Sequence, residues 1–246
     1  MSDLPDETGR GQGGESAATR CGFVAVIGAP NAGKSTLVNR LVGAKVTIVS
    51  HKVQTTRVPV RGIAVLGPSQ LVFIDTPGIF DPKKRLDRAM VDAAWGGAGD
   101  ADVVCLVVDA VRGLDETASG ILDKLAATST PRVLALNKVD KVTDKAALLA
   151  LAAAINERVA FARTFMISAE NGSGVDDLAA HLAASVPEGP WHYPEDEISD
   201  APLRLLAAEI TREKVYQYVH DEVPYAVTVE TRSEERRVGK ECRSRW

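Results

Sequence analysis

The sequence has few cysteines, few aromatic residues and no long apolar run. Three of its 246 residues are cysteine and 5% are aromatic. No stretch approaches the roughly 18 apolar residues of a membrane-spanning helix. Three cysteines cannot form a disulfide framework, which favours a reducing, cytosolic compartment. Residues 1–20 lack the apolar core of a signal peptide and are rich in Gly, Ser, Glu and Asp. We therefore expect them to be a disordered tail.

The overall charge is mildly acidic and unevenly spread. The chain has 29 Lys and Arg against 33 Asp and Glu, a net charge of −4. Residues 232–246 hold six basic and three acidic side chains, so the remainder carries −7. Such a balance gives no general attraction for nucleic acid or anionic lipid. With 45% apolar residues, the chain can bury the core of one large domain or two smaller ones.

From Phe23 onward, short apolar runs alternate with segments whose apolar residues have helical spacing. This alternation predicts an α/β fold with a mainly parallel sheet and helices on both faces, over residues 21–186. Ligands of such folds bind at the carboxyl ends of the strands. The expected strands are Phe23–Ile27, Val60–Leu66, Leu71–Ile74, Val103–Val108, Val133–Leu136 and Phe165–Ile167. The expected helices are Lys34–Val42, Arg85–Ala94, Glu116–Ala126, Lys145–Glu157 and Val175–Ser185.

A proline-rich, acidic stretch separates this domain from a second one. Residues 187–202 contain four prolines and are predicted to be a linker. Residues 203–231 then give a helix over Leu203–Val219 and a strand over Tyr225–Glu230, which is the start of a domain and not a whole one. We expect this helix to expose an ordinary mixed-charge face, although Arg212 and Lys214 could in principle meet RNA phosphates.

A phosphate-binding loop follows the first expected strand. Gly28–Ser35 reads GAPNAGKS and fits GxxxxGK[ST] between a strand and a helix. The glycines let the backbone wrap closely around phosphates, and its N–H groups supply positive potential. Lys34 is expected to reach the β- and γ-phosphates and Ser35 to ligate Mg²⁺. The structural alternative is a glycine-rich turn before a helix.

Three further motifs end strands on the same expected edge. Asn137–Asp140 reads NKVD, and the Asp140 carboxylate can accept two N–H bonds from guanine that adenine cannot offer. Asp75–Gly78 reads DTPG and is expected to approach Mg²⁺ through Asp75 and the γ-phosphate through the Gly78 N–H. Ser168–Glu170 reads SAE, where backbone N–H groups can meet the guanine oxygen. Alone, an N-K-x-D segment would more often be a helix-capping loop.

These motifs in this order resemble the translation-factor-like P-loop GTPases, and within them the Era family of bacterial ribosome-assembly GTPases. GAPNAGKS, QTTR, DTPG, NKVD and SAE carry the likeness in the first domain. PEDEISD, AAEITREKVYQY and EVPYAVTVE resemble the family's linker and the opening of its RNA-binding KH domain. The likeness extends over about Phe23 to Glu230. It implies a P-loop GTPase domain followed by an incomplete α+β KH domain.

The resemblance also assigns residues. The GTP-binding positions are Gly28, Ala29, Pro30, Asn31, Ala32, Gly33, Lys34, Ser35, Asp75, Thr76, Pro77, Gly78, Asn137, Lys138, Val139, Asp140, Ser168, Ala169 and Glu170. The first switch consists of Gln54, Thr55, Thr56, Arg57 and Val58. The Mg²⁺ positions are Ser35, Thr56 and Asp75, with Thr56 favoured over Thr55. Relatives with an asparagine in the phosphate loop can use potassium, which would make Asn31 a K⁺ ligand.

By the same resemblance the protein hydrolyses GTP to GDP and phosphate and acts in 16S rRNA processing and 30S subunit assembly. Its partners would be the 3′ end of 16S rRNA and the 30S subunit, contacted by a monomer through the KH domain. A peripheral contact with the inner face of the cell membrane stays open. Ile79 stands where Ras-like enzymes carry a water-orienting glutamine, so intrinsic hydrolysis should be slow. No catalytic base is evident; Lys34, Thr56 and Gly78 are candidates for transition-state or water positioning.

The likeness ends near Glu230. No GxxG loop, which a KH domain uses to clamp a nucleic-acid backbone, follows Leu203. Arg232–Trp246 reads RSEERRVGKECRSRW, which looks like an in-frame translation of a sequencing adapter. The alternative interpretation of this stretch is a basic RNA-binding tail.

Two other functions remain open from the sequence. One is a nucleotide-gated binding module in which hydrolysis is incidental, and the other is a different Era-like GTPase. A P-loop kinase is disfavoured by NKVD and by the absence of an evident acceptor site.

Overall fold

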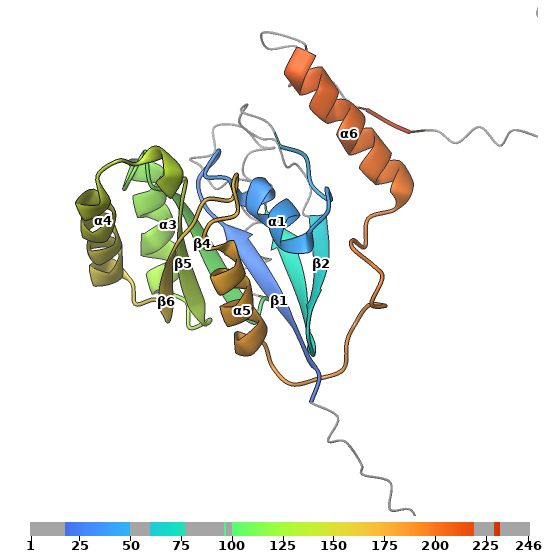
Figure 1. Ribbon diagram of the computed structural model, residues 1–246, viewed down its shortest axis with the longest axis horizontal. Helices are drawn as coiled ribbons and strands as arrows, with labels where there is room; N and C mark the ends of the chain where they lie inside the picture. Colours follow the sequence, from blue (N-terminus) through green and yellow to red (C-terminus); the bar gives the residue numbers. More distant parts are fainter. Residues whose placement is uncertain (1–17, 50–59, 77–95, 97–99, 219–228, 232–246) are drawn as a thin grey trace, which may run out of the picture.

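One six-stranded sheet organises the chain. The computed structural model describes residues 18–49, 60–76, 96, 100–218 and 229–231. The strands lie in the order β2-β3-β1-β4-β5-β6, and all neighbours are parallel except β2 and β3 (Figure 1). They are β1 (Arg20–Ile27), β2 (Val60–Leu66), β3 (Ser69–Asp75), β4 (Val103–Asp109), β5 (Arg132–Asn137) and β6 (Arg163–Met166). The mainly parallel α/β architecture is confirmed.

Helices cover both faces of this sheet. On one face lie α1 (Lys34–Val42) and α5 (Val175–Ser185), and on the other lie α3 (Glu116–Ala126) and α4 (Lys145–Arg158). Helix α6 (Leu203–Tyr218) lies apart from the sheet, and a short 3₁₀ turn spans Val139–Lys141 (Figure 1). The strand β2 runs antiparallel to β3 because only Gly67 and Pro68 separate them, and so short a link cannot make a parallel crossover. The expected helix Arg85–Ala94 lies outside the described residues, as does most of Tyr225–Glu230; Val229 and Glu230 have no strand structure.

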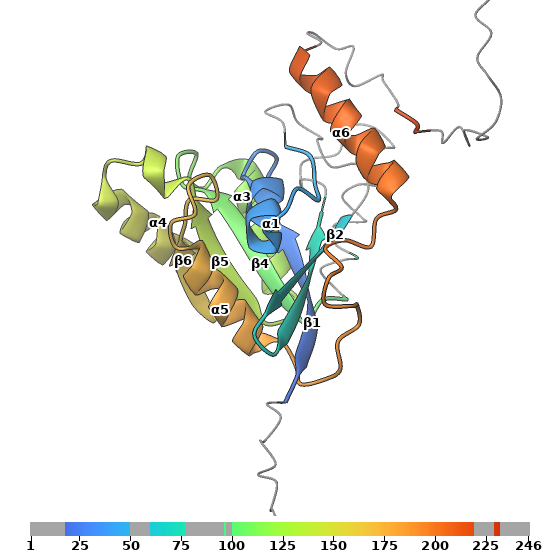
Figure 2. The ribbon, with the colours of Figure 1, turned by 45° about the vertical axis from the view of Figure 1, so that its right-hand side comes forward.

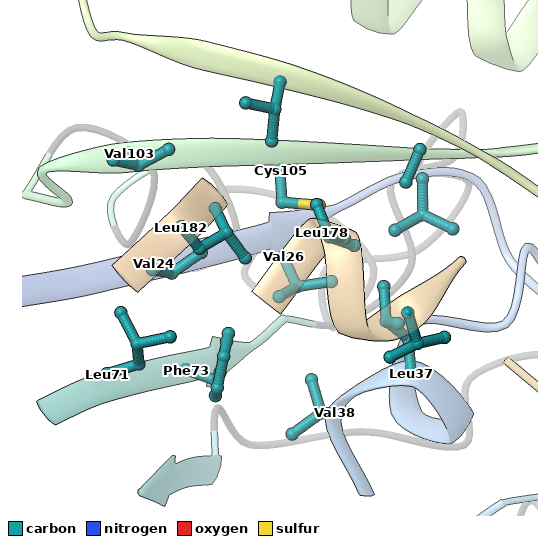
Figure 3. Packing of buried hydrophobic residues seen from close by; sticks show 14 of the residues in the cluster. Val24, Val26, Leu37, Val38, Leu71, Phe73, Val103, Cys105, Leu178 and Leu182 are labelled. Atoms are coloured by element: carbon teal, nitrogen blue, oxygen red, sulfur yellow. The ribbon is translucent and has the colours of Figure 1, made fainter. Parts of the chain in front are cut away.

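Alternation along the strands divides the core into two layers. Val24 and Val26 of β1 join the layer that packs under α1 and α5, with Leu37 and Leu182 from those helices (Figure 3). Ala25 and Ile27 point to the other face, where α3 and α4 cover the sheet. Because both faces are covered, the central strands are apolar along most of their length, with polar residues at their ends. Burial also raises the pKa of the Cys105 thiol to about 12, so this thiol stays protonated at neutral pH.

The folded domain begins slightly earlier than the sequence indicated. β1 starts at Arg20, whose backbone N–H donates to the Pro68 carbonyl at 2.9 Å. The Arg20 guanidinium donates to the carbonyls of Ala184 and Val186, both at 2.9 Å. Thr19 and Arg20, which the sequence placed in the disordered tail, therefore belong to the described fold.

The proline-rich stretch after α5 lies against the domain instead of hanging free. The buried Gln70 side chain accepts hydrogen bonds at Oε1 from the backbone N–H groups of His192 and Tyr193, at 2.9 and 3.0 Å. Further along, the Ile63 N–H donates to the Ile198 carbonyl at 2.9 Å, which adds an antiparallel bridge at the β2 edge. The linker follows one side of the sheet before it reaches α6 (Figure 2).

Helix α6 is attached to the first domain by a buried carboxylate. Glu213 is 2% exposed and accepts the Val49 backbone N–H at 3.0 Å, and it also pairs with Lys45. Arg212 is 3% exposed and pairs with Glu209. The expectation of an ordinary exposed face is therefore wrong for Arg212 and Glu213. Lys214 is exposed, as that expectation required.

None of the helices in the described part of the chain is long and apolar enough to cross a membrane.

Candidate nucleotide-binding site

The phosphate loop connects β1 to α1 at the carboxyl edge of the sheet. Gly28, Asn31 and Gly33 have φ values of 153°, 63° and 98°, which favour glycine or asparagine. A Cβ on Gly28 would lie 2.3 Å from the Val107 carbonyl oxygen, and one on Gly33 would lie 2.2 Å from Nδ2 of Asn137. Close packing therefore forbids side chains here. No side chain caps α1, so its first N–H groups suit an anion.

Lys34 is buried inside the loop. Its Nζ donates to the carbonyls of Gly28 at 3.1 Å and Ala29 at 2.9 Å, and the residue is 6% exposed. Burial lowers the pKa of Lys34 to about 8, and the nearby Asp75 carboxylate opposes that shift. A phosphate in the loop would supply the counter-charge that two carbonyls cannot. A buried ammonium with only carbonyl partners favours an anion beside it, and the contact of Lys34 with the β- and γ-phosphates stays a prediction.

Ser35 and Asp75 meet at the start of α1. The Ser35 hydroxyl donates to Oδ2 of Asp75 at 2.8 Å, and Asp75 is fully buried at the end of β3. Thr76 donates its hydroxyl to the Val26 carbonyl at 2.8 Å, which ties the residue after β3 to β1. A hydroxyl beside a carboxylate is a hard oxygen pair of the kind Mg²⁺ prefers, so these residues fit the ion.

The other predicted phosphate-side and switch positions are not described by the structure. They are Pro77, Gly78, Ile79, Gln54, Thr55, Thr56, Arg57 and Val58. Among the described residues, no group of three or more His, Cys, Asp or Glu side chains gathers as a metal site.

Asn137 joins the phosphate loop to the loop after β6. Its Nδ2 donates to the Ala32 carbonyl at 2.8 Å, and its Oδ1 accepts the Ala169 N–H at 2.9 Å. The side chain is 2% exposed, so both bonds form away from water. The sequence assigned Asn137 to guanine reading; the structure gives it the additional task of holding two loops in register.

Lys138 makes a second link to the phosphate loop. Its backbone is left-handed, with φ of 65°, and its ammonium donates to the Asn31 carbonyl at 2.7 Å. The same ammonium pairs with Asp109 at 2.6 Å. Asn137 and Lys138 of the NKVD motif therefore bind the carbonyls of Ala32 and Asn31, which are neighbours in the phosphate loop.

Asp140 remains exposed at the rim, in the 3₁₀ turn that follows. The Val139 N–H donates to the Ile167 carbonyl at 3.2 Å and fixes this turn to the end of β6. Lys141 pairs with Glu170 at 3.0 Å, which raises the pKa of Lys141. An exposed carboxylate on an anchored turn is accessible to the hydrogen-bond donors of a base.

The Ser168–Glu170 loop is held from both sides. The N–H groups of Ser168 and Ala169 already donate within the domain, to the Ser173 carbonyl and to Asn137, both at 2.9 Å. Arg40 of α1 donates to the Ala169 carbonyl at 3.3 Å and to the Glu170 carbonyl. The N–H groups of Ser168 and Ala169 are therefore engaged within the domain, and the contact of this loop with the guanine oxygen stays a prediction.

Sequence reasoning missed two residues of this arrangement. Arg40 lies on α1, one helical turn beyond the phosphate-loop motif, and no motif marks it. Asp109 ends an apolar strand at the ligand edge, and an acidic residue in that position is the signal that identifies it.

The chain is similar in sequence to known GTPases. The family model of the 50S ribosome-binding GTPases matches residues 23–138. GTPase Era of Bradyrhizobium sp. strain BTAi1 is 64% identical over 220 residues, 89% of this chain and 71% of that protein. GTPase Era of Brucella suis is 64% identical over 230 residues, 92% of this chain and 74% of that protein.

Two solved structures are similar over most of the chain. One is Era in complex with MgGDPNP and nucleotides 1506–1542 of 16S ribosomal RNA, with a TM-score of 0.80 and 39% identity. The other is an Aquifex aeolicus Era variant bound to GDP and AlF₄⁻, with a TM-score of 0.79 and 39% identity. Each match covers 84% of this chain and 70% of the other.

Proposed function

This chain belongs to the Era family of GTPases, and we propose that it acts in 16S rRNA processing and assembly of the 30S ribosomal subunit. The hydrolysis of GTP follows from the family. The ribosomal role rests on the likeness to an Era structure that contains nucleotides of 16S ribosomal RNA. We further propose that the protein works as a monomer in the cytoplasm.

In the proposed binding mode, each part of the site meets one part of GTP. The N–H groups of the phosphate loop and the Lys34 ammonium hold the phosphates, because both point positive charge into the loop. Asp140 accepts the N1–H and the exocyclic amine of guanine. Asn137 keeps these two subsites at a fixed separation through its bonds to Ala32 and Ala169. These two Asn137 hydrogen bonds, called here the Asn137 bracket, are the observation that carries the proposed GTP-binding mode, since the base and the phosphates must be bound at the same time.

Ser35, Asp75 and Thr56 would hold Mg²⁺, which offsets the charge of the β- and γ-phosphates. Lys34 offsets negative charge that develops toward the leaving phosphate. Ile79 cannot orient a water molecule, so hydrolysis by the protein alone is slow. A K⁺ ion at Asn31 would add positive charge near the phosphates, where other GTPases use an arginine.

Residues 203–231 open the KH domain in this proposal, and they lack the loop that clamps RNA. We expect residues 1–246 to bind GTP and GDP but to bind the 3′ end of 16S rRNA poorly. An RNA of nucleotides 1506–1542 tests this, with full-length Era of Brucella suis as the comparison protein. A chain that ends at residue 231 lacks the basic residues 232–246 and shows whether they contribute to RNA binding. Tight, sequence-selective binding by residues 1–246 would overturn the expectation.

The alternative function is a nucleotide-gated binding module whose output is partner docking in the GTP state. Multiple-turnover phosphate release, measured with and without 30S particles on a full-length protein, separates the two. An enzyme whose cycle is tied to assembly is stimulated by the particles. A binding module docks to them with GTP or GDPNP bound, and its turnover does not change.

A further inference from the structure

Asp109 ends β4 at the carboxyl edge of the sheet, beside the end of β5. The register of the two strands pairs Asp109 with Asn137, and the Ala110 N–H donates to the Asn137 carbonyl at 2.9 Å. Asp109 is 8% exposed. No part of the GTPase motifs includes it, yet it lies next to the motif that contains Asp140.

The two carboxylate oxygens of Asp109 have different partners. Oδ1 accepts the backbone N–H groups of Val111 at 2.9 Å and Arg112 at 3.4 Å, which shapes the turn after β4. Oδ2 accepts the Lys138 ammonium at 2.6 Å. Lys138 in turn donates to the Asn31 carbonyl at 2.7 Å. One carboxylate thus joins the turn after β4, the NKVD loop and the phosphate loop.

Lys138 needs such support because its backbone is in the left-handed region, at a φ of 65°. That conformation is costly for a residue with a Cβ and persists only where surrounding contacts require it. The Lys138 side chain is held at its far end by Asp109 and Asn31. If the Asp109 charge is removed, Lys138 loses its ionic partner, and the turn that presents Asp140 loses one of its anchors.

We propose that Asp109 is a positioning residue for guanine recognition, acting through Lys138 on the orientation of Asp140. This inference rests on the proposed assignment of Asp140 to the guanine N1–H and exocyclic amine. Two parallel hydrogen bonds to a planar base depend strongly on orientation. A displaced Asp140 therefore loses discrimination between bases before the phosphate contacts are lost.

The test compares GDP with IDP, whose base lacks the exocyclic amine. We expect the wild-type chain to bind GDP about tenfold tighter, the equivalent of one hydrogen bond to a charged group. Asp109→Asn keeps an oxygen for the turn after β4 but removes the charge that Lys138 meets. It should reduce the GDP preference at least about threefold. Asp109→Ala should reduce it further.

Two controls make the outcome decisive. Asp123 of α3 forms an ion pair with Arg158 of α4, with 2.7 Å between nitrogen and oxygen. Asp123→Asn breaks this pair and should leave the GDP preference unchanged. Asp140→Ala should abolish the preference; if it does not, the assignment of Asp140 to the base is wrong. If Asp140→Ala abolishes it while both Asp109 variants keep the wild-type ratio, Asp109 has no positioning role. Equal weakening of GDP and IDP by Asp109→Asn would likewise overturn the proposal, because it would indicate a purely structural contact.

Discussion

The buried carboxylate of Glu213 accepts a hydrogen bond from the backbone N–H of Val49 at 3.0 Å and joins α6 to the segment that enters the first switch. Asn39 of α1 also holds this segment, since its Oδ1 accepts hydrogen bonds from the backbone N–H groups of Val46 and Thr47, both at 2.9 Å. Residues 45–49 therefore lie between α1, which begins at the phosphate loop, and α6.

Removal of the Glu213 carboxylate should release α6 from this segment. A hydrogen bond to a charged group contributes about 1.5–3 kcal/mol, so Glu213→Ala should speed hydrogen exchange at the Val49 amide by roughly 10- to 100-fold. Glu213→Gln keeps an acceptor and should have a smaller effect. Lys214→Ala, on the exposed side of the same helix, is the matched control. Unchanged Val49 exchange in Glu213→Ala would show that the contact is not maintained in solution.

The protonation of Lys34 should change when nucleotide binds. Burial sets the pKa of Lys34 near 8, so much of this amine is neutral at pH 8.5 without ligand. Phosphates favour the ammonium, so binding takes up a proton and GDP affinity falls as the pH rises through 8. Calorimetry in two buffers of different ionisation enthalpy measures the uptake. Lys34→Arg stays charged at this pH and should abolish it. Equal uptake by both proteins would assign the proton to another group.

Asn31 gives a clean test of the potassium proposal. Its left-handed backbone, with φ of 63°, is also accessible to glycine, so Asn31→Gly removes the side chain without straining the loop. If the amide oxygen holds K⁺, wild-type hydrolysis is faster in K⁺ than in Na⁺, and Asn31→Gly loses that difference. Asn31→Asp, which keeps an oxygen and tolerates the same backbone, should retain part of it. Equal wild-type rates in the two salts would contradict the proposal.

Loss of the Asn137 bracket should affect both stability and binding. Asn137→Ala leaves the buried Ala32 carbonyl and Ala169 N–H without a partner, at a cost of about 2–5 kcal/mol. GDP affinity should fall by at least about tenfold, since the two loops no longer hold base and phosphates at one spacing.

Asn156 provides the comparison, because it makes two side-chain hydrogen bonds away from the site, at 2.8 and 3.0 Å. Asn156→Ala should lower the melting temperature and leave GDP binding intact. If Asn137→Ala lowers only the melting temperature, the bracket has no part in binding.

Much of the site was predictable from the sequence because short motifs fix local geometry. Gly28 and Gly33 are required by close packing, and a lysine and a serine follow at fixed positions in the loop. The alternation of short apolar runs with helix-period segments predicted the mainly parallel sheet, since strands buried on both faces are mostly apolar. These features depend on neighbours in the chain.

The remaining features depend on contacts between distant residues. Glu213 is buried because residues 45–49 lie beside it, and a mixed-charge helix gives no indication of that. The linker lies along the sheet because the single buried amide of Gln70 accepts two of its N–H groups. The position of Asp109 at the end of an apolar strand is visible in the sequence, but its contact with Lys138 appears only when β4 and β5 are aligned. Pairings of this kind have no local pattern.

In the proposed binding mode, Asp140 reads the guanine base at the edge of this sheet. The most direct measurement is the affinity for GDP and for XDP, whose base has a carbonyl where guanine has the exocyclic amine, in the wild type and in Asp140→Asn. An asparagine can donate to that carbonyl and accept the N1–H, whereas it faces the guanine amine with its own N–H. We predict that the wild type prefers GDP by about 100-fold and that Asp140→Asn reverses the preference. A variant that still prefers GDP as strongly as the wild type would contradict the account.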